Sequence, residues 1–230
     1  MNYTHAKVLD INSQLDTDFN LSAPSDVANP YNLTLSKGPA AFNLANQFNG
    51  NFSYEFPFGS GKAIAGSASG LVDQLIGGWQ WNGILTAQSG LPFTPTMGSN
   101  RSGSGDTANP DVPNRNPAFS GPVITGDPNR WFNPQAFLLP MAGTYGNAGR
   151  NQFLGPNLID LDTSLFKRIR ITEGLNLQFR AEAFNILNRA NFGQPSIGVF
   201  TGTSISPSAG VITSTATTSR QLQFALKLSF

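Results

Sequence analysis

The chain has 230 residues, with 14 basic and 13 acidic side chains and a net charge of +1, so its charge gives no reason to expect a nucleic-acid partner. It contains no cysteine, which excludes a disulfide framework and a thiolate metal site. Charged residues make up only 12% of the chain, whereas glycine and proline number 24 and 16. This composition favours strands and turns over helices, and we expect an all-β fold.

No stretch of about 18 apolar residues is present, which excludes a transmembrane helix. A membrane β-barrel stays compatible with the sequence, because its strands need only about 9 to 11 residues each and alternate in polarity. The amino-terminal sequence MNYTHAKVLDIN shows no basic region followed by an apolar one, so no signal peptide is visible. We therefore expect either a soluble protein or the rear part of a longer chain.

Six amphipathic strands are predicted, and the first three lie in the amino-terminal half. A weak strand covers residues 2–11, and a clearer one covers residues 47–56. The Asn49-Gly50 dipeptide within the second could form a hairpin turn, but the alternation continues through it in phase, which favours one long strand. Residues 71–78, LVDQLIGG, could form a helical turn before the third strand, which runs through residues 79–91.

The other three strands close the chain. Residues 159–171 and 175–183 alternate in polarity, with Phe166 and Lys167 as exceptions, and the short segment 172–174 between them predicts a β-hairpin. In the last strand, RQLQFALKLSF, successive side chains point to opposite sides, so one face suits hydrocarbon and the other suits water. The apolar face consists of Leu222, Phe224, Leu226, Leu228 and Phe230.

Long connections alternate with shorter ones along the chain. The long ones cover residues 12–41, 93–157 and 188–219, and the shorter ones cover residues 57–78 and 172–174. Compact soluble domains seldom carry loops longer than about 12 to 15 residues, whereas transmembrane barrels combine long extracellular loops with short periplasmic turns. If the last strand ends at the periplasmic rim, every long loop falls outside. The sequence therefore predicts an antiparallel transmembrane β-barrel segment located in the outer membrane.

A family resemblance supports this interpretation. The block GTYGNAGRNQFLGPNLIDLDTSLFKRIRITEGLNLQFRAEAFNILNRANFGQP, together with the terminal RQLQFALKLSF, resembles the carboxyl end of Oar-like TonB-dependent outer-membrane receptors. YEFPFG and GGWQWNGILTAQSGLPFT match the same family, and the resemblance covers residues 39–230. It implies a barrel of about 22 strands around a plug. Residues 1–230 would then be a carboxyl-terminal barrel fragment that lacks the plug and the earlier strands.

The resemblance also implies a function and partners. It implies uptake of a bulky nutrient across the outer membrane, with TonB-type energy coupling through the missing amino-terminal part. Outer-membrane lipid would surround the barrel, and the barrel assembly machinery would recognise the last strand through main-chain pairing and alternate side chains. Leu222, Phe224, Leu226, Leu228 and Phe230 would form that assembly signal, although facing lipid would alone explain their pattern. A soluble or secreted carbohydrate-binding β-sandwich is the alternative function.

Catalysis has little support in the sequence, and we expect neither an enzyme nor a cofactor or metal site. His5 is the only histidine and lies in the weakest strand. Asp160 and Asp162 could form a carboxylate pair, and a hydrolase using Asp160 or Glu182 is a third possibility. The nearby arginines instead favour a charge network on the lumen side, consistent with a polar barrel interior. These arginines are Arg168, Arg170 and Arg180.

Three further motifs have simple structural explanations. The sequence GSGKAIAG around Lys62 fails the spacing of a phosphate-binding loop and is better explained as a glycine-rich turn. Residues 100–116 include Asp106 and Asp111, which could hold calcium, but a mobile surface loop explains them better. Trp79 and Trp81 would belong to an aromatic belt at the inner rim, or to the core of a soluble sandwich.

Overall fold

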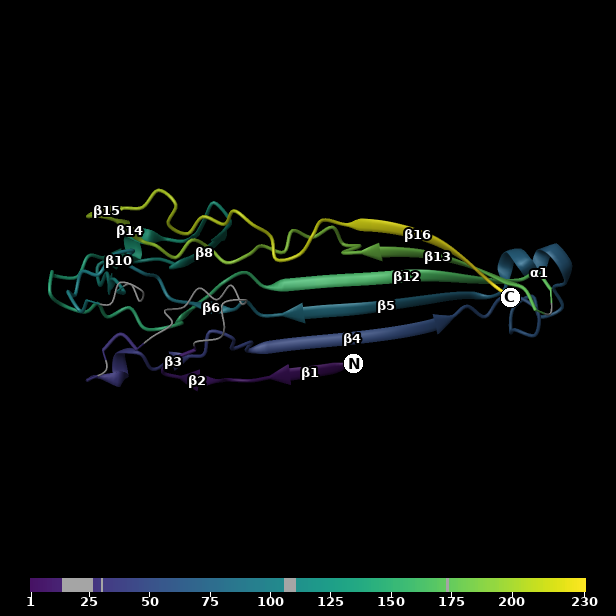
Figure 1. The fold of residues 1–230 in the computed structure, drawn as a ribbon, viewed down its shortest axis with the longest axis horizontal. Helices are drawn as coiled ribbons and strands as arrows, with labels where there is room; N and C mark the ends of the chain where they lie inside the picture. Colours follow the sequence, from purple (N-terminus) through teal and green to yellow (C-terminus); the bar gives the residue numbers. More distant parts are fainter. Residues whose placement is uncertain (14–26, 30, 106–110, 173) are drawn as a thin grey trace.

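The main element of this computed structural model is a six-stranded antiparallel sheet in the order β1-β4-β5-β12-β13-β16 (Figure 1). The structure describes residues 1–13, 27–29, 31–105, 111–172 and 174–230. The long strands run side by side, with the long connections gathered at one end, the loop end, and helix α1 at the other, the α1 end (Figure 1). The strands are β1 (Asn2–His5), β4 (Asn46–Glu55), β5 (Trp79–Gln88), β12 (Leu158–Arg170), β13 (Asn176–Phe184) and β16 (Gln221–Ser229).

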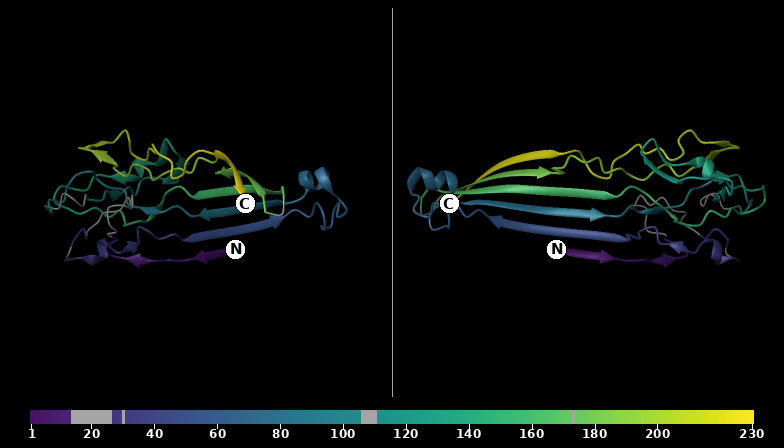
Figure 2. Two further views of the ribbon diagram at one scale, coloured as in Figure 1. Left: turned by 45° about the vertical axis from the view of Figure 1, so that its right-hand side comes forward. Right: turned by 180° about the vertical axis from the view of Figure 1, so that it is seen from behind.

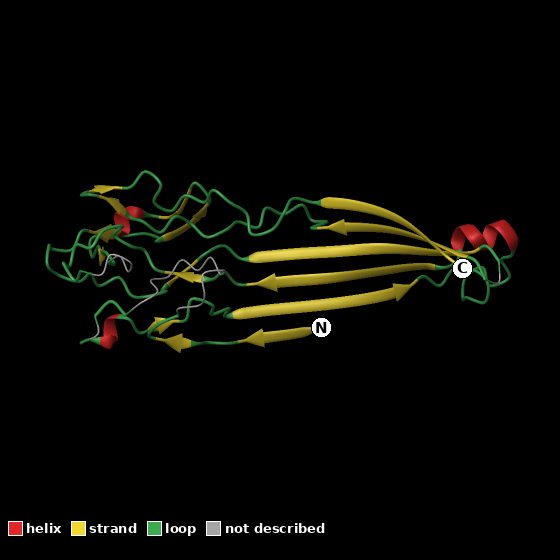
Figure 3. Cartoon of the chain, viewed as in Figure 1, coloured by secondary structure: helices red, strands yellow, loops and turns green. Residues whose placement is uncertain are grey.

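Short elements occupy the connections (Figure 3). Helix α1 spans Gly70–Ile76, which confirms the predicted helical turn, and within the described residues no helix is long and apolar enough to cross a membrane. The loop end carries the 3-10 helices η1 (Leu33–Leu35) and η2 (Pro134–Ala136) and five two-stranded sheets. These pair β2 (Leu9–Asp10) with β3 (Gly38–Pro39), β6 (Pro92–Phe93) with β11 (Phe153–Leu154), β7 (Asn114–Arg115) with β10 (Phe137–Leu138), β8 (Ile124–Asp127) with β9 (Arg130–Phe132), and β14 (Phe200–Thr201) with β15 (Ser204–Ile205).

The predicted long strands are largely confirmed. β4 passes through Asn49-Gly50 without a turn, as the unbroken alternation predicted, and β12 and β13 pair as the predicted hairpin. Two boundaries were wrong. Residues 2–11 form two separate strands, because β1 pairs with β4 whereas β2 pairs with β3. The third strand ends at Gln88 instead of continuing to Leu91, because β6 turns away to pair with β11.

The register of the sheet divides its side chains into an apolar face and a polar face. Residues directly opposite each other on neighbouring strands lie on the same face, so each row can be followed across the sheet. One row of the apolar face reads Tyr54, Trp81, Leu165, Ala181 and Phe224, whereas a row of the polar face reads Ser53, Asn82, Ser164, Glu182 and Gln223. The polarity that alternates along each strand therefore becomes two surfaces of opposite character.

The six-stranded sheet is a single layer. The two further views show no second sheet over either of its faces (Figure 2), and many of the large apolar side chains on the apolar face are exposed, among them Tyr54, Trp81, Phe224 and Leu226. A β-sandwich requires two sheets whose inner faces cover each other. The sandwich alternative is therefore wrong for this arrangement.

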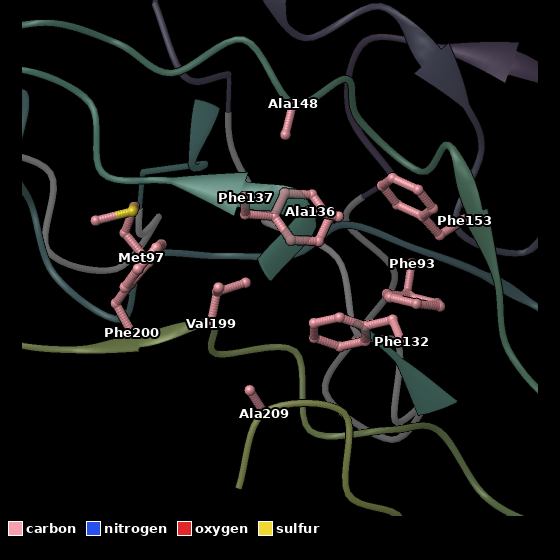
Figure 4. Close-up of a cluster of buried hydrophobic side chains, with 10 residues drawn as sticks. All are labelled: Phe93, Met97, Phe132, Ala136, Phe137, Ala148, Phe153, Val199, Phe200 and Ala209. Atoms are coloured by element: carbon pink, nitrogen blue, oxygen red, sulfur yellow. The ribbon is translucent and has the colours of Figure 1, made fainter. Parts of the chain in front are cut away.

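The main hydrophobic core of the described residues lies in the long connections and not against the sheet (Figure 4). Four phenylalanine rings pack in a closed cycle, with centroids 5.7 to 5.9 Å apart. Segments far apart in sequence meet there, so the connections form a packed loop domain instead of a set of independent loops. Its buried members are Phe93, Met97, Phe132, Ala136, Phe137, Ala148, Phe153, Val199, Phe200 and Ala209.

Candidate functional site

Aromatic side chains concentrate on the apolar face near the α1 end. Phe52 and Trp81 pack edge to face with centroids 4.6 Å apart, and Tyr54 packs in the same way on Phe56 at 5.5 Å. Phe56 in turn stacks on Phe58 at 6.0 Å. Trp81 therefore lies in a band of rings at this end of the sheet, and Trp79 lies beside it, because its carbonyl accepts a hydrogen bond from Phe56 N at 3.0 Å. From Phe48 to Phe56 the strand extends about 26 Å, close to the height of the apolar band of a membrane barrel, about 25 Å.

The aromatic band covers a glycine of the apolar face and also contains hydrogen-bonded polar groups. The Phe52 ring lies over Gly83, where an added Cβ would collide with it. Trp81 Nε1 donates a hydrogen bond of 2.5 Å to Thr163 Oγ1, and that hydroxyl donates to Asn82 O at 2.9 Å. The polar atoms of the Trp81 and Thr163 side chains are therefore satisfied within this face, which suits a surface with no water beside it.

The polar face carries the charged residues of the long strands, with the exception of Lys167. The predicted carboxylates and arginines do share this face, but the predicted network between them is wrong. The ion pair there joins Arg180 to Glu182 at 3.5 Å, and the Arg180 guanidinium also lies 4.6 Å from the Phe166 ring centre. Asp162 Oδ1 accepts a hydrogen bond from Asn185 N at 2.9 Å. In the described part of the chain, no ion pair joins Asp160 or Asp162 to an arginine.

The predicted assembly signal lies on an edge strand. β16 pairs with β13 alone among the described strands, and its apolar side chains stand on the apolar face. Phe224 stacks on Phe179 with centroids 6.4 Å apart. Phe230 follows the end of the strand and is fully exposed. Leu222, Phe224, Leu226, Leu228 and Phe230 therefore form one continuous exposed strip beside an open row of backbone hydrogen-bonding groups.

A pocket of about 200 Å³ opens in the loop domain. Its lining combines apolar side chains with a few polar groups, the usual composition of a small-molecule site. Exposed Lys37 supplies a cation and Tyr145 a half-buried hydroxyl, while the carboxylate of Asp111 is bonded to Ser102 Oγ at 2.8 Å. The volume is below the 300 to 1,000 Å³ of typical ligand sites, so the pocket fits one chemical group of a larger ligand.

Buried polar residues hold one wall of the pocket. Arg150, 5% exposed, forms an ion pair with Asp10, and its Nη2 donates to Ser13 Oγ at 2.6 Å. Next to it, Asn151 Nδ2 donates to Pro39 O at 2.8 Å, and Thr94 Oγ1 donates to Asn151 Oδ1 at 2.9 Å. These bonds tie the first connection to the connection after β5, so the pocket wall is built from two distant segments.

The block that carries the family resemblance contains asparagines with structural roles. Asn191, 1% exposed, accepts a hydrogen bond from Ile159 N and donates one to Ile159 O, both at 3.0 Å. Its side-chain amide therefore replaces a strand partner at the start of β12. Asn185 has φ of 46°, a left-handed conformation that asparagine tolerates better than most residues. Its Nδ2 donates to Arg189 O at 3.0 Å and to Thr218 O at 2.9 Å.

The remaining candidate residues have ordinary structural partners. His5 is exposed and lies 3.0 Å from Asn46 Oδ1. Lys62 forms an exposed ion pair with Glu55 at 3.1 Å. Asp111 is buried within the loop domain, so the mobile surface loop predicted there is wrong at this position, and Asp106 lies outside the described residues. Within the described ranges, no three acidic or histidine side chains gather as a metal site would require.

Two features of the site were not predicted. The pocket joins residues more than 100 positions apart, such as Lys37 and Tyr145, and no local pattern indicates such a contact. Lys167 was noted only as an exception to the alternation. It lies on the apolar face, opposite Trp79 and Phe179, and is 4% exposed. The break in alternation at Lys167 was the signal in the sequence that could have indicated a polar partner for this lysine on the apolar face.

Comparison with known protein families gives a match. A family model described as an outer membrane beta barrel domain matches residues 1–223. The match runs from before β1 to the first three residues of β16 and so includes the other five strands of the sheet and the loop domain. No curated protein and no solved structure matches the chain.

Proposed function

Because the chain belongs to the outer membrane beta barrel domain family and is located in the outer membrane, we propose that it acts in an Oar-like TonB-dependent receptor that takes up a bulky nutrient. In this family context the apolar face meets lipid and the polar face lines the barrel interior. The loop end is extracellular and the α1 end is periplasmic. The proposed role belongs to the complete barrel, of which the six strands are one part of the wall.

The loop domain with its pocket is the observation that supports a receptor. A simple pore needs only polar walls, whereas here the extracellular connections pack around their own core and enclose a pocket at the outer surface. Lys37 and Tyr145 offer a charge and a hydroxyl to one group of a nutrient that is too large to enter whole. A sugar or peptide unit fits this combination of polar and apolar lining.

The two edges of the sheet support a larger barrel. β1 covers only the first part of β4, from Asn46 to Asn49, and β16 has β13 as its one described partner. Unpaired backbone groups within lipid each cost several kcal/mol, so spanning sheets close into barrels. We propose that further strands complete the wall to about 22, and that a plug and a TonB-contacting segment belong to the same receptor.

Uptake and energy coupling are tested together in cells. A strain lacking the gene and the complemented strain are given labelled oligosaccharides and peptides, and short-term uptake is measured with and without a protonophore. We expect at least one compound whose uptake needs the gene and stops when the proton gradient collapses. Gene-dependent uptake that continues without the gradient would contradict TonB coupling, and uptake of every compound without the gene would contradict the receptor role.

We also propose that the strip on β16 is the signal read by the barrel assembly machinery. Its support is the combination of an open strand edge with alternating exposed apolar side chains, the arrangement used in recognition by strand addition.

Replacing the terminal aromatic is expected to impair assembly. Phe230→Asp should lower the amount of protein in the outer membrane several-fold, because it places a charge where the machinery reads an apolar ring. The measurement is the outer-membrane level after fractionation. Ser229→Asp is the matched control, since it adds the same charge one residue earlier on the polar face. Equal levels of both variants would contradict the signal role.

A further inference from the structure

Helix α1 rests on the apolar side of the sheet. Trp79 Nε1 donates a hydrogen bond of 3.0 Å to Leu75 O, and Lys167 Nζ donates to the same carbonyl at 3.3 Å and to Gly77 O. Trp79 and Lys167 are cross-strand partners on the apolar face. The last turn of the helix therefore contacts the apolar face at the α1 end of the sheet, the end proposed to be periplasmic.

This contact explains a cation on a face that meets lipid. A lysine on the lipid face of a barrel is most destabilising at the midplane and much less so near the interface. Lys167 does not reach water, because it is 4% exposed. Its ammonium instead meets two carbonyls at the carboxyl end of α1, where a cation is favoured, and lies 5.2 Å from the Trp79 ring centre. The helix thus separates this charge from the acyl chains.

The outward side of α1 is apolar. Leu71, Val72 and Leu75 are 78%, 56% and 73% exposed, and their spacing places them on one side of the helix. Asp73 lies on the other side, where its Oδ1 accepts a hydrogen bond from Ser60 N at 2.5 Å. Three neighbouring aliphatic side chains on so short a helix gain nothing from exposure to water.

The exposed side chains of α1 continue a surface that already meets lipid. The helix joins that surface at the level of Trp79, next to the rings of Tyr54, Phe56 and Phe58. Aromatic rings of this kind mark the boundary between headgroups and acyl chains. A helix at this level, with one apolar side, has the character of an interfacial helix.

We propose that α1 lies in the periplasmic leaflet of the outer membrane, with Leu71, Val72 and Leu75 inserted among the acyl chains of its phospholipids. The inserted side chains anchor the connection between β4 and β5, and the carbonyls of the last turn cover the ammonium of Lys167. The proposal depends on the location of the barrel in the outer membrane and is independent of the nutrient.

The absence of cysteine makes a direct test possible. Leu75→Cys and Val72→Cys are labelled with nitrobenzoxadiazole in isolated outer membranes, and quenching by stearic acid carrying a nitroxide near its headgroup is measured. Gln74→Cys is the matched control, because it is exposed on the same helix and is turned about 100° from residue 75 and about 160° from residue 72. All substituted residues are exposed, so each variant is expected to reach the outer membrane.

The account expects blue-shifted emission and several-fold stronger quenching at positions 72 and 75 than at position 74. Emission typical of water at all three positions would overturn the proposal, because the helix would then lie in the periplasm. Equally strong quenching at all three would also overturn it, because a helix at the interface keeps one side out of the acyl chains.

Discussion

Leu85→Arg is expected to remove most of the protein from the outer membrane. Leu85 lies on the apolar face between its cross-strand partners Gly50 and Leu161, about midway between the two ends of the sheet. An arginine at this depth costs about 2–4 kcal/mol in a membrane barrel, because its guanidinium must leave water. The measurement is the amount of folded protein in the outer-membrane fraction.

The neighbouring residue supplies the control for this effect. Thr86 pairs with Asn49 and Asp160 on the polar face, so Thr86→Arg places the same charge beside water and a carboxylate. We expect near-normal levels of this variant. If both arginine variants were lost to the same extent, the assignment of the two faces would be wrong.

Phe132→Ala is expected to unfold the loop domain while the strands stay in the membrane. Phe132 is 0% exposed and packs on Phe93 and Phe137 with centroids 5.7 and 5.9 Å away. Truncating a buried phenylalanine to alanine typically costs about 3–5 kcal/mol. Added protease should therefore cut the long connections in intact cells much faster than in the unsubstituted protein, at an unchanged outer-membrane level.

Met141→Ala is the control for this truncation, because Met141 is in the same connection but 74% exposed. It should leave the rate of proteolysis unchanged. Loss of the Phe132→Ala protein from the membrane would show that the loop core also holds the sheet, contrary to the separation of core and sheet seen here.

The long strands could be predicted because their signal is local. Alternation within β4 indicated a single strand through Asn49-Gly50, and the pattern in β12 and β13 predicted their pairing. The core of the loop domain could not be predicted in this way. Phe93 and Phe132 lie in irregular segments with no period, and their contact depends on how distant parts of the chain return to the same place.

In the candidate site, too, features with a local sequence pattern could be predicted, whereas features that depend on long-range contacts could not. The strip at the end of the chain, from Leu222 to Phe230, followed from alternation and is confirmed as an exposed apolar edge, while its role in assembly stays a prediction. The pocket and the pair of Arg150 with Asp10 depend on contacts between distant segments. Lys167 broke the pattern of its strand, and its partners, carbonyls of another segment, carry no signature in the sequence.

The orientation of the sheet in the outer membrane is tested most directly by labelling two single cysteines with a maleimide that cannot cross membranes. Met141→Cys marks the loop end, and Ser67→Cys marks the connection at the α1 end; both positions are exposed. The account predicts that Met141→Cys is labelled in intact cells and that Ser67→Cys is labelled only after the outer membrane is permeabilised. Labelling of Ser67→Cys but not Met141→Cys in intact cells would contradict it.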